Sequence, residues 1–472
     1  MDLIRLIAAL ALPWLAGAAL VALVYRHDVA AGRDGTTCWI TGVGWFVGVM
    51  LVTLLMRLES KVGIAFSGQS LGSVLVGLTV LFILPMRAFV PAWRTAPRRA
   101  RDVLVGAGLP ASERVVWIGL LAWIAARLLM VLSEDVLRPL FPWEAWTVWA
   151  TKAKVFFALG HIVPFADADA WQAANGSAWF DARPQSPITL PLLQTWMATM
   201  AGRWDDAFVA TPWSMALLAL ALATFGGLRR VGMPNIVSLV AVWLIVSLPL
   251  LDVNAALAGY ADLFVAAFLV LGALSLLQWQ RERSIAAALQ TLFLAVSLSL
   301  VKPSGVFWAA CLAAGGVVAG WPARGMRIVA GGIGLAVFGA LVLSRTPQPL
   351  GDPTWHLEFA PDVQLAIDSA LLLGSWHLLW YGVVAMALFG YRHAFSPALA
   401  PLTAVALCGL VYLLALTVFP AAASWLSDVN LLNQGALQLA PVATIWMIAV
   451  FQAWSSEWHA KRRPIRPAVT DA

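Results

Sequence analysis

Charged side chains are scarce in this sequence. Asp, Glu, Lys and Arg together account for 11% of the 472 residues, whereas soluble domains average about 25%. Apolar residues account for 61% of the chain, and the mean hydropathy is +0.83. These values exclude a soluble globular protein and indicate an integral membrane protein.

Cysteine is nearly absent as well: Cys38, Cys311 and Cys408 lie far apart, in or near apolar runs. This spacing excludes a disulfide framework and a paired-cysteine metal site. The sequence also lacks a GxxxxGK[ST] phosphate loop, a GxSxG elbow and an HExxH motif, which argues against an enzyme that uses a nucleotide on the cytoplasmic side. No basic patch is interleaved with exposed aromatics in a soluble region, so we set nucleic acid aside as a partner.

What the sequence has in abundance is long apolar runs. We expect an all-α, polytopic integral membrane protein with about 13 transmembrane helices. The spans are predicted near residues 3–25, 38–56, 66–86, 115–133, 207–228, 233–252, 261–279, 284–301, 304–320, 326–344, 364–390, 396–419 and 434–454. The predicted divisions are N-terminal helices with a basic loop (1–114), a main transmembrane domain (115–455) and a basic tail (456–472).

Lysine and arginine predict the orientation. The loop 87–114, the connections between later spans and the tail 456–472 are basic, and the alternation of spans puts all of them on one side. The formal charge of +6 is then an excess of positive charge on cytoplasmic loops. The opposite side receives the N-terminus and the loops with mixed chemistry, chiefly 134–206. We therefore expect a multi-pass protein of a bacterial inner membrane, with these loops in the periplasm.

The stretch from Pro142 to Pro191 concentrates carboxylates, lysines, amides and aromatic rings within one loop. Its first part is two-faced when it is read as a helix. One face carries Glu144, Thr147, Thr151 and Lys154, and the other carries Trp143, Trp146, Ala150, Ala153 and Phe157. We predict an amphipathic helix in the membrane interface, with its rings toward lipid and its polar groups toward water. An anchor of the aromatic belt with solvated charges is the simpler alternative.

Five segments of the predicted outer side carry a family pattern. They are PWEAWTVWATKAK at 142–154, PQSPITLPLLQTW at 184–196, GYADL at 259–263, the span end at Lys302 with Gly305, and NQGALQLAP at 433–441. Together they resemble bacterial glycosyltransferases of the GT-C superfamily, in the broad group related to glycosyltransferase family 39. The resemblance runs in order through roughly residues 115–455. The chain departs from the group's pattern by a Glu for an Asp at 144, and Gln185, Ser186, Ser304 and Gln434 replace an Asp, a Tyr, an acid and an Arg.

The resemblance implies transfer of a sugar from a polyprenyl-phosphate donor to a glycan or lipid acceptor at the periplasmic face. Such a reaction needs a base for the acceptor hydroxyl, a cation facing the departing phosphate and an apolar groove for the polyprenyl tail. Glu144 stands at the group's acidic position and is the predicted catalytic base. Lys302 is the predicted phosphate partner, because it ends an apolar run just before Pro303. The other predicted substrate-binding residues are Lys152, Lys154, Arg183, Tyr260 and Asp262.

Each of these assignments has an alternative. Glu134 and Asp135 compete as bases, although they lie beside Arg138 and a simple ion pair explains them equally well. Asp181 is a secondary candidate. Lys302 is also the kind of lysine that snorkels to the headgroups. Arg127 lies inside a span and needs a partner there, whether structural or functional.

Two groups of polar residues bear on metal binding. His161 lies near Asp167 and Asp169, and His356 lies near Asp352, Glu358 and Asp362. Neither group has the spacing of a metal site, so we interpret both as solvated loop charge. We expect no cofactor; a divalent metal stays open without support from the spacing.

Two other functions stay open. A transporter or flippase for a lipid-linked saccharide would also place aromatic rings and cations at the membrane surface, and a non-catalytic relative would bind polyprenyl phosphate alone. The sequence shows no repeat of fixed period and no inverted pair of broken helices, which weakens the transporter hypothesis.

Overall fold

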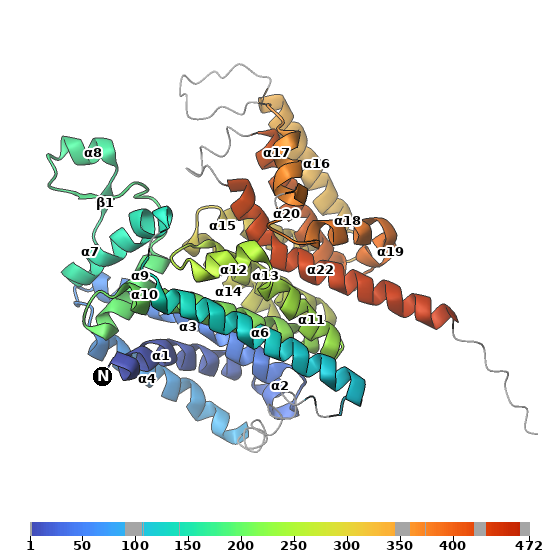
Figure 1. Ribbon diagram of the computed structural model, residues 1–472, viewed down its shortest axis with the longest axis horizontal. Coiled ribbons are helices and arrows are strands. Elements are labelled where there is room, and N and C mark those ends of the chain that lie inside the picture. Colours follow the sequence, from blue (N-terminus) through green and yellow to red (C-terminus); the bar gives the residue numbers. More distant parts are fainter. Residues whose placement is uncertain are drawn as a thin grey trace, which may run out of the picture.

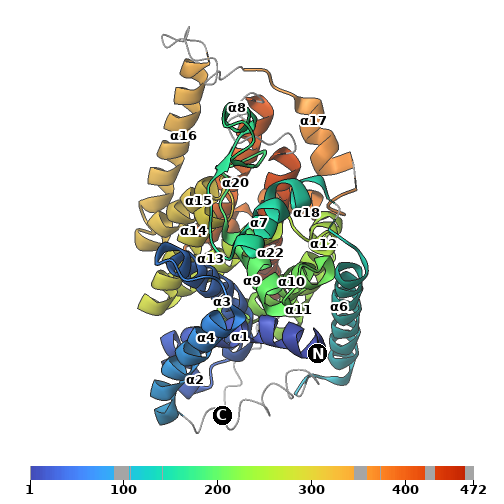
Figure 2. The same ribbon diagram turned by 90° about the vertical axis from the view of Figure 1, so that its left-hand side faces the viewer.

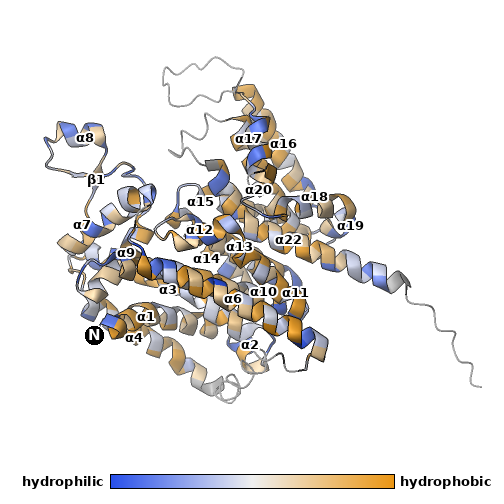
Figure 3. Ribbon diagram, viewed as in Figure 1, coloured by the Kyte–Doolittle hydropathy of each residue, from blue (hydrophilic) through white to orange (hydrophobic). Residues whose placement is uncertain are grey.

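The chain folds into an all-α bundle (Figure 1). The computed structural model describes residues 2–89, 106, 108–140, 142–344, 359–372, 374–419 and 431–462. Within these residues the only strands are β1 (Phe165–Ala166) and β2 (Trp179–Phe180), which pair in parallel. Figure 3 shows hydrophobic residues over most of the bundle helices, whereas α8 and its neighbouring loops carry hydrophilic ones.

The N-terminal quarter forms a tightly packed helix pair with further helices around it. Its elements are α1 (Asp2–Val24), α2 (Arg26–Ala31), α3 (Thr36–Lys61), α4 (Gly68–Ile83) and η1 (Leu84–Phe89). Glycines let α1 and α3 approach closely, because a Cβ added at Gly48 would lie 2.0 Å from the carbonyl oxygen of Pro13. Small residues at such contacts are typical of helices that associate within a membrane.

One long helix leads into the polar loop. This helix is α6 (Ala111–Leu137), and the loop after it holds η2 (Ala145–Ala150), α7 (Thr151–Leu159), α8 (Ala168–Ala173) and α9 (Thr189–Ala201). Helix α9 is largely buried, and Trp196 donates its indole N–H to the carbonyl oxygen of Ala9. The predicted loop 134–206 is therefore partly a packed layer of helices at one end of the bundle.

The remaining helices complete the bundle around α13. They are α10 (Asp206–Arg230), α11 (Asn235–Val246), α12 (Pro249–Ala256), α13 (Asp262–Glu282), α14 (Ile285–Val301), α15 (Gly305–Gly320), α16 (Gly325–Leu343), α17 (Val363–Ile367), η4 (Asp368–Leu372), α18 (Leu379–Phe389), α19 (Tyr391–Ala394), α20 (Ala400–Val418) and α22 (Leu431–Arg462). Every residue of α13 from Asp262 to Gln278 is buried, as is typical of a helix that is apolar on all sides and lies in a bundle core. Helix α16 lies at the edge of the bundle (Figure 2), and most of its residues are exposed.

The helix lengths confirm a multi-pass membrane protein. Among the described residues, nine helices are long and apolar enough to cross a membrane. A tenth span results if α11 and α12, which meet at a 63° bend, count as one. The bend has a local cause: Leu248 is extended and precedes Pro249, which lacks an N–H and disfavours a helical residue before it. Three of the predicted spans correspond to shorter apolar helices, Ile285–Val301, Gly305–Gly320 and Leu379–Phe389.

The predicted continuous span over 364–390 is wrong. This stretch contains α17, the π-helical η4 and α18, and a non-helical segment separates η4 from α18. Gly374 and His377 in that segment have φ angles of +69° and +50°. The left-handed region is incompatible with a continuing right-handed helix, so the helix stops there.

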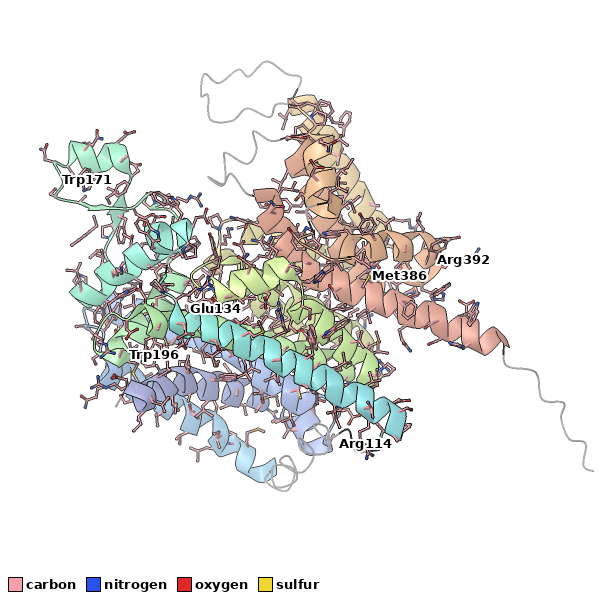
Figure 4. The ribbon with its side chains drawn as sticks, viewed as in Figure 1. Arg114, Glu134, Trp171, Trp196, Met386 and Arg392 are labelled. Atoms are coloured by element: carbon pink, nitrogen blue, oxygen red, sulfur yellow. The ribbon has the colours of Figure 1, made fainter. Side chains whose placement is uncertain are left out.

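Ion pairs lie at both ends of the bundle. At one end, Arg33 pairs with Glu282 and Asp28, and Arg230 also pairs with Asp28. At the other end, Arg203 pairs with Asp2 near the N-terminus. Figure 4 shows Arg114 and Arg392 toward the right of the bundle and Glu134, Trp171 and Trp196 toward its left. The described basic loops and the described mixed-chemistry loops thus lie at opposite ends, as the alternation of spans requires; the basic residues between 90 and 105 and after 462 lie outside the described residues.

We predict that the end with α8 faces the periplasm. In a variant without its native cysteines, Ser177→Cys should react with an impermeant maleimide in intact spheroplasts, because Ser177 is exposed in the loop after α8. Ala323→Cys, which is exposed between α15 and α16 beside Arg324, should react only after permeabilisation. The reverse labelling pattern would contradict a periplasmic site.

Candidate functional site

Two polar clusters lie at the end of the bundle that carries α7. The first, which we call the loop cluster, consists of Glu144, Lys152, Asp181 and Arg183. The second, the buried cluster, consists of Asp262, Lys302, Trp308, Gln434 and Gln438. Together they contain five of the seven predicted catalytic and substrate-binding residues.

Glu144 and Arg183 form the accessible part of the loop cluster. An Arg183 guanidinium nitrogen lies 3.2 Å from a carboxylate oxygen of Glu144, and 26% of the Arg183 side chain and 18% of the Glu144 side chain are exposed. The pair is therefore partly open to its surroundings. An ion pair of this kind contributes little net stability, because water competes for both charges.

Lys152 and Asp181 form the closed part of the loop cluster. Both side chains are fully buried, with the Lys152 ammonium 3.3 Å from Asp181 Oδ1. Lys152 also donates to the carbonyl oxygen of Arg183 at 2.7 Å, and Asp181 accepts from the Arg183 backbone N–H at 2.6 Å. Burial lowers the pKa of Lys152 and raises the pKa of Asp181, against the opposing attraction of each partner. These contacts fix the backbone that carries the Arg183 side chain.

The helix that presents Glu144 differs from the predicted amphipathic α-helix. It begins as the π-helical turn η2, in which the Thr151 hydroxyl donates to the carbonyl oxygen of Trp146, five residues earlier. Trp143 and Trp146 are exposed, at 71% and 43%, as expected for rings that face lipid. However, Ala150 and Ala153, which were predicted on the same lipid-facing side, are buried in the protein. The reason is α9, which packs beneath this helix and donates from Thr195 to the carbonyl oxygen of Ala153.

Asp262 and Lys302 form the centre of the buried cluster. The Lys302 ammonium lies 2.9 Å from Asp262 Oδ1, and the exposed fractions of the two side chains are 8% and 1%. Lys302 also donates to Gln434, and Gln438 donates to Asp262 while accepting from the Trp308 indole. Each group of this buried pair thus faces an opposite charge and takes part in further hydrogen bonds, as burial of an ion pair requires.

All five segments of the family pattern meet through direct contacts. The first two meet where Thr195 of the second segment donates to the carbonyl oxygen of Ala153 in the first, and the last three meet in the buried cluster. Thr189 donates to the carbonyl oxygen of Leu300 at 2.5 Å, which joins the second segment to the helix that ends at Lys302. Gly259 packs against the helix of Glu144, since a Cβ added at Gly259 would lie 2.4 Å from the Cβ of Ala145. Segments from four distant parts of the chain thus form one continuous site.

Two predicted substrate-binding residues lie outside these clusters. The Lys154 ammonium lies over the Trp204 ring, 5.2 Å from its centroid. Tyr260 accepts a hydrogen bond at its backbone carbonyl from the Trp213 indole. The structure therefore gives Lys154 an aromatic partner of its own, and gives the backbone of Tyr260 a packing contact beside the site.

The competing carboxylates have partners as well. Glu134 pairs with Arg138, and Asp135 accepts hydrogen bonds from the backbone and the hydroxyl of Ser214. Arg127 lies inside a predicted span and was expected to need a partner there; the structure pairs it with Asp252, on the neighbouring helix α12. No group of three or more potential metal ligands occurs in the described part of the chain. Asp167 caps α8, while His356, Asp352 and Glu358 lie outside the described residues.

Trp308 and Gln438 were not predicted as site residues. Their backbone positions within apolar helices gave no reason to select them over other polar residues. The usable signal was a glutamine inside an apolar run, since a buried amide in a membrane span requires partners.

Comparisons of the chain with family models, with curated proteins and with solved structures found no match.

We predict that Gly259→Ala disturbs the site. The residue has φ +112°, and the added methyl group would overlap Ala145, the neighbour of Glu144. Overpacking of this kind costs about 1–3 kcal/mol, and we expect a lower melting temperature in detergent. Gly331→Ala on α16 is the matched control, because nothing lies within 4 Å of the added Cβ. Equal melting temperatures for the two variants would contradict the close contact.

Proposed function

We propose that the chain is a membrane glycosyltransferase of the GT-C type. It transfers a sugar from a polyprenyl-phosphate-linked donor to a glycan or lipid acceptor at the periplasmic face of a bacterial inner membrane. The observation that carries this proposal is the contact network that joins all five segments of the family pattern. The alternation of spans alone places these segments at one end of the bundle, but it does not bring them into direct contact with one another.

The proposal assigns the base to Glu144. Its carboxylate is partly exposed beside Trp143 and Trp146, at the predicted depth of the membrane interface. A lipid-linked phosphate and a polar acceptor can both reach that depth. The base takes the proton of the acceptor hydroxyl as that oxygen bonds to the anomeric carbon of the sugar, and the bond from that carbon to the phosphate oxygen breaks, so that polyprenyl phosphate leaves with the electron pair.

The phosphate partner in this proposal is Arg183 instead of Lys302. Lys302 is nearly buried and is already neutralised by Asp262, so a phosphate could reach it only by breaking that pair. Arg183 is more exposed, and its planar guanidinium suits a phosphate group. Lys302 then has a supporting role, in which it holds α13, α14 and α22 together below the site.

An apolar cavity supports the binding of a hydrophobic tail. It has a volume of about 130 Å³ and lies between α18, α20 and α22. Leu439 lines it, directly after Gln438 of the buried cluster. The cavity extends to Tyr391 and Phe395, so it offers apolar space along α22 between the buried cluster and the end of the bundle with Arg392, and a hydrophobic tail requires such space.

The test is sugar transfer in reconstituted liposomes. The assay combines the purified protein with a panel of radiolabelled polyprenyl-phosphate sugars and with a lipid extract as acceptor. Wild-type protein should form a labelled product, and heat-denatured protein should not. Movement of the donor across the bilayer without any transfer would contradict the proposal.

A transporter or flippase for a lipid-linked saccharide is the second candidate. Two helix interruptions face each other within the bundle: the bend between α11 and α12, and the segment between η4 and α18. The backbone N–H of Leu250 donates to Ser375, and a ring nitrogen of His377 lies 3.1 Å from the carbonyl oxygen of Ser247. Interrupted helices near the midplane are typical of transporters. Donor movement in the liposome assay distinguishes this candidate from the enzyme.

A further inference from the structure

The Glu144–Arg183 pair differs from the other ion pairs of the site in how readily it can open. Lys152 and Asp181 have no exposed side-chain surface, and Lys302 with Asp262 is nearly as buried. Opening either of those pairs would leave an uncompensated charge inside the protein. Glu144 and Arg183 are both partly exposed, so either side chain can exchange its partner at small cost.

The backbone of Arg183 is fixed while its side chain is exchangeable. Both its N–H and its carbonyl oxygen are bound by the buried pair, at 2.6 Å to Asp181 and 2.7 Å to Lys152. The guanidinium therefore moves about a fixed point. It can reach Glu144 or an anion close to Glu144 without rearrangement of the loop.

A carboxylate and a phosphate compete for the same guanidinium. A carboxylate and the phosphodiester of a lipid-linked sugar each carry one negative charge, and each offers two oxygens that can accept parallel N–H bonds from a guanidinium. When a phosphate binds Arg183, Glu144 loses its contact with that guanidinium. A carboxylate without that cation is a stronger base.

We propose that the phosphate of the lipid donor displaces Glu144 from Arg183, so that Glu144 becomes available as a base only after the donor is bound. This inference rests on the proposed function. Arg183 is the exchanged group, and Lys152 and Asp181 are positioning residues that set its reach. The enzyme then binds its donor first and activates its acceptor second.

The test is a double-mutant cycle of binding, without any transfer step. Wild type, Glu144→Gln, Arg183→Gln and the double variant are placed in nanodiscs, and their affinities for undecaprenyl phosphate are measured. Glu144→Gln should bind about twofold to fivefold more tightly, because Arg183 no longer has a competing carboxylate. Arg183→Gln should bind about tenfold more weakly or worse. The double variant should match Arg183→Gln.

The double-mutant cycle distinguishes displacement of Glu144 from Arg183 from the general electrostatic effect that loss of the Glu144 charge has on phosphate binding. Removal of any nearby negative charge favours an anion, but that effect would persist in the Arg183→Gln background. An equal gain from Glu144→Gln in both backgrounds would therefore overturn the inference, as would the absence of a gain in wild type. Asp205→Asn is the matched control: Asp205 pairs with Arg203 at 3.0 Å at the same end of the bundle, and its loss should leave the affinity unchanged.

Competition identifies the source of the phosphate. Phosphatidylglycerol or inorganic phosphate, each added at the same concentration as undecaprenyl phosphate, should not displace it, and displacement by either would overturn the assignment to a polyprenyl donor. Failure of this inference can also be distinguished from failure of the proposed function. If the binding cycle fails but the protein transfers sugar, only the proposed displacement of Glu144 from Arg183 is rejected. If the cycle succeeds but the protein transfers no sugar, the proposed enzymatic function is rejected and the displacement is retained.

Discussion

Replacement of Glu144 by Gln should lower the rate of sugar transfer by about 10²–10⁴-fold, the usual contribution of a positioned general base. Glutamine keeps the shape and the hydrogen-bonding reach of the side chain but cannot accept the proton. Expression and thermal stability should stay near those of the wild type, because the pair with Arg183 is partly exposed and contributes little to folding. The measurement is the transfer of radiolabelled sugar in liposomes at saturating donor.

The conservative variant sharpens this test. Glu144→Asp keeps a carboxylate, which is also the residue type of the resembling group at this position, but draws it back by about one bond. It should retain more activity than Glu144→Gln, although a displacement of about 1 Å can itself cost on the order of 10²-fold. Transfer by the Gln variant at the wild-type rate would assign the base to another carboxylate at this end of the bundle.

Replacement of Lys302 by Met should destabilise the protein by about 3–5 kcal/mol, because it leaves the Asp262 carboxylate buried without its cation. The second variant, Lys302→Met with Asp262→Asn, removes both charges and keeps an amide beside Gln438. It should recover most of the lost stability. Thermal unfolding in detergent and chemical denaturation both measure the difference.

The same variants distinguish the two roles of Lys302. If Lys302 has a structural role, stability should fall in the single variant and recover in the double variant. The double variant should then bind polyprenyl phosphate with an affinity near that of the wild type. A direct phosphate role predicts that both variants lose affinity equally. The second result would assign the phosphate contact to Lys302, as predicted from the sequence, and would contradict its assignment to Arg183.

The sequence predicted the membrane fold because hydropathy is a local property of the chain. It failed over 364–390 because composition does not encode the left-handed residues Gly374 and His377, which interrupt an otherwise apolar run. It also predicted one continuous helix over 233–252, although Pro249 was a visible signal of the bend there.

The candidate site was predicted at the level of residues but not of partners. In the sequence, the lysines at 152, 154 and 302 were all candidate substrate contacts, and Lys302 was preferred as the phosphate partner. In the structure their environments differ: Lys152 is fully buried beside Asp181, Lys154 lies over the Trp204 ring, and Lys302 pairs with Asp262. These partners lie between 29 and 50 residues away along the chain, and only the tertiary fold brings them together.

The core helix α13 has ion pairs at both of its ends. Asp262 at its first residue binds Lys302, and Glu282 at its last residue binds Arg33. A helix of 21 residues is about 31 Å long, so one rigid rod connects the site to the basic end of the bundle. The helix cannot move along its axis without straining an ion pair at each end. A displacement of α13 at one face of the membrane would therefore be transmitted to the other face.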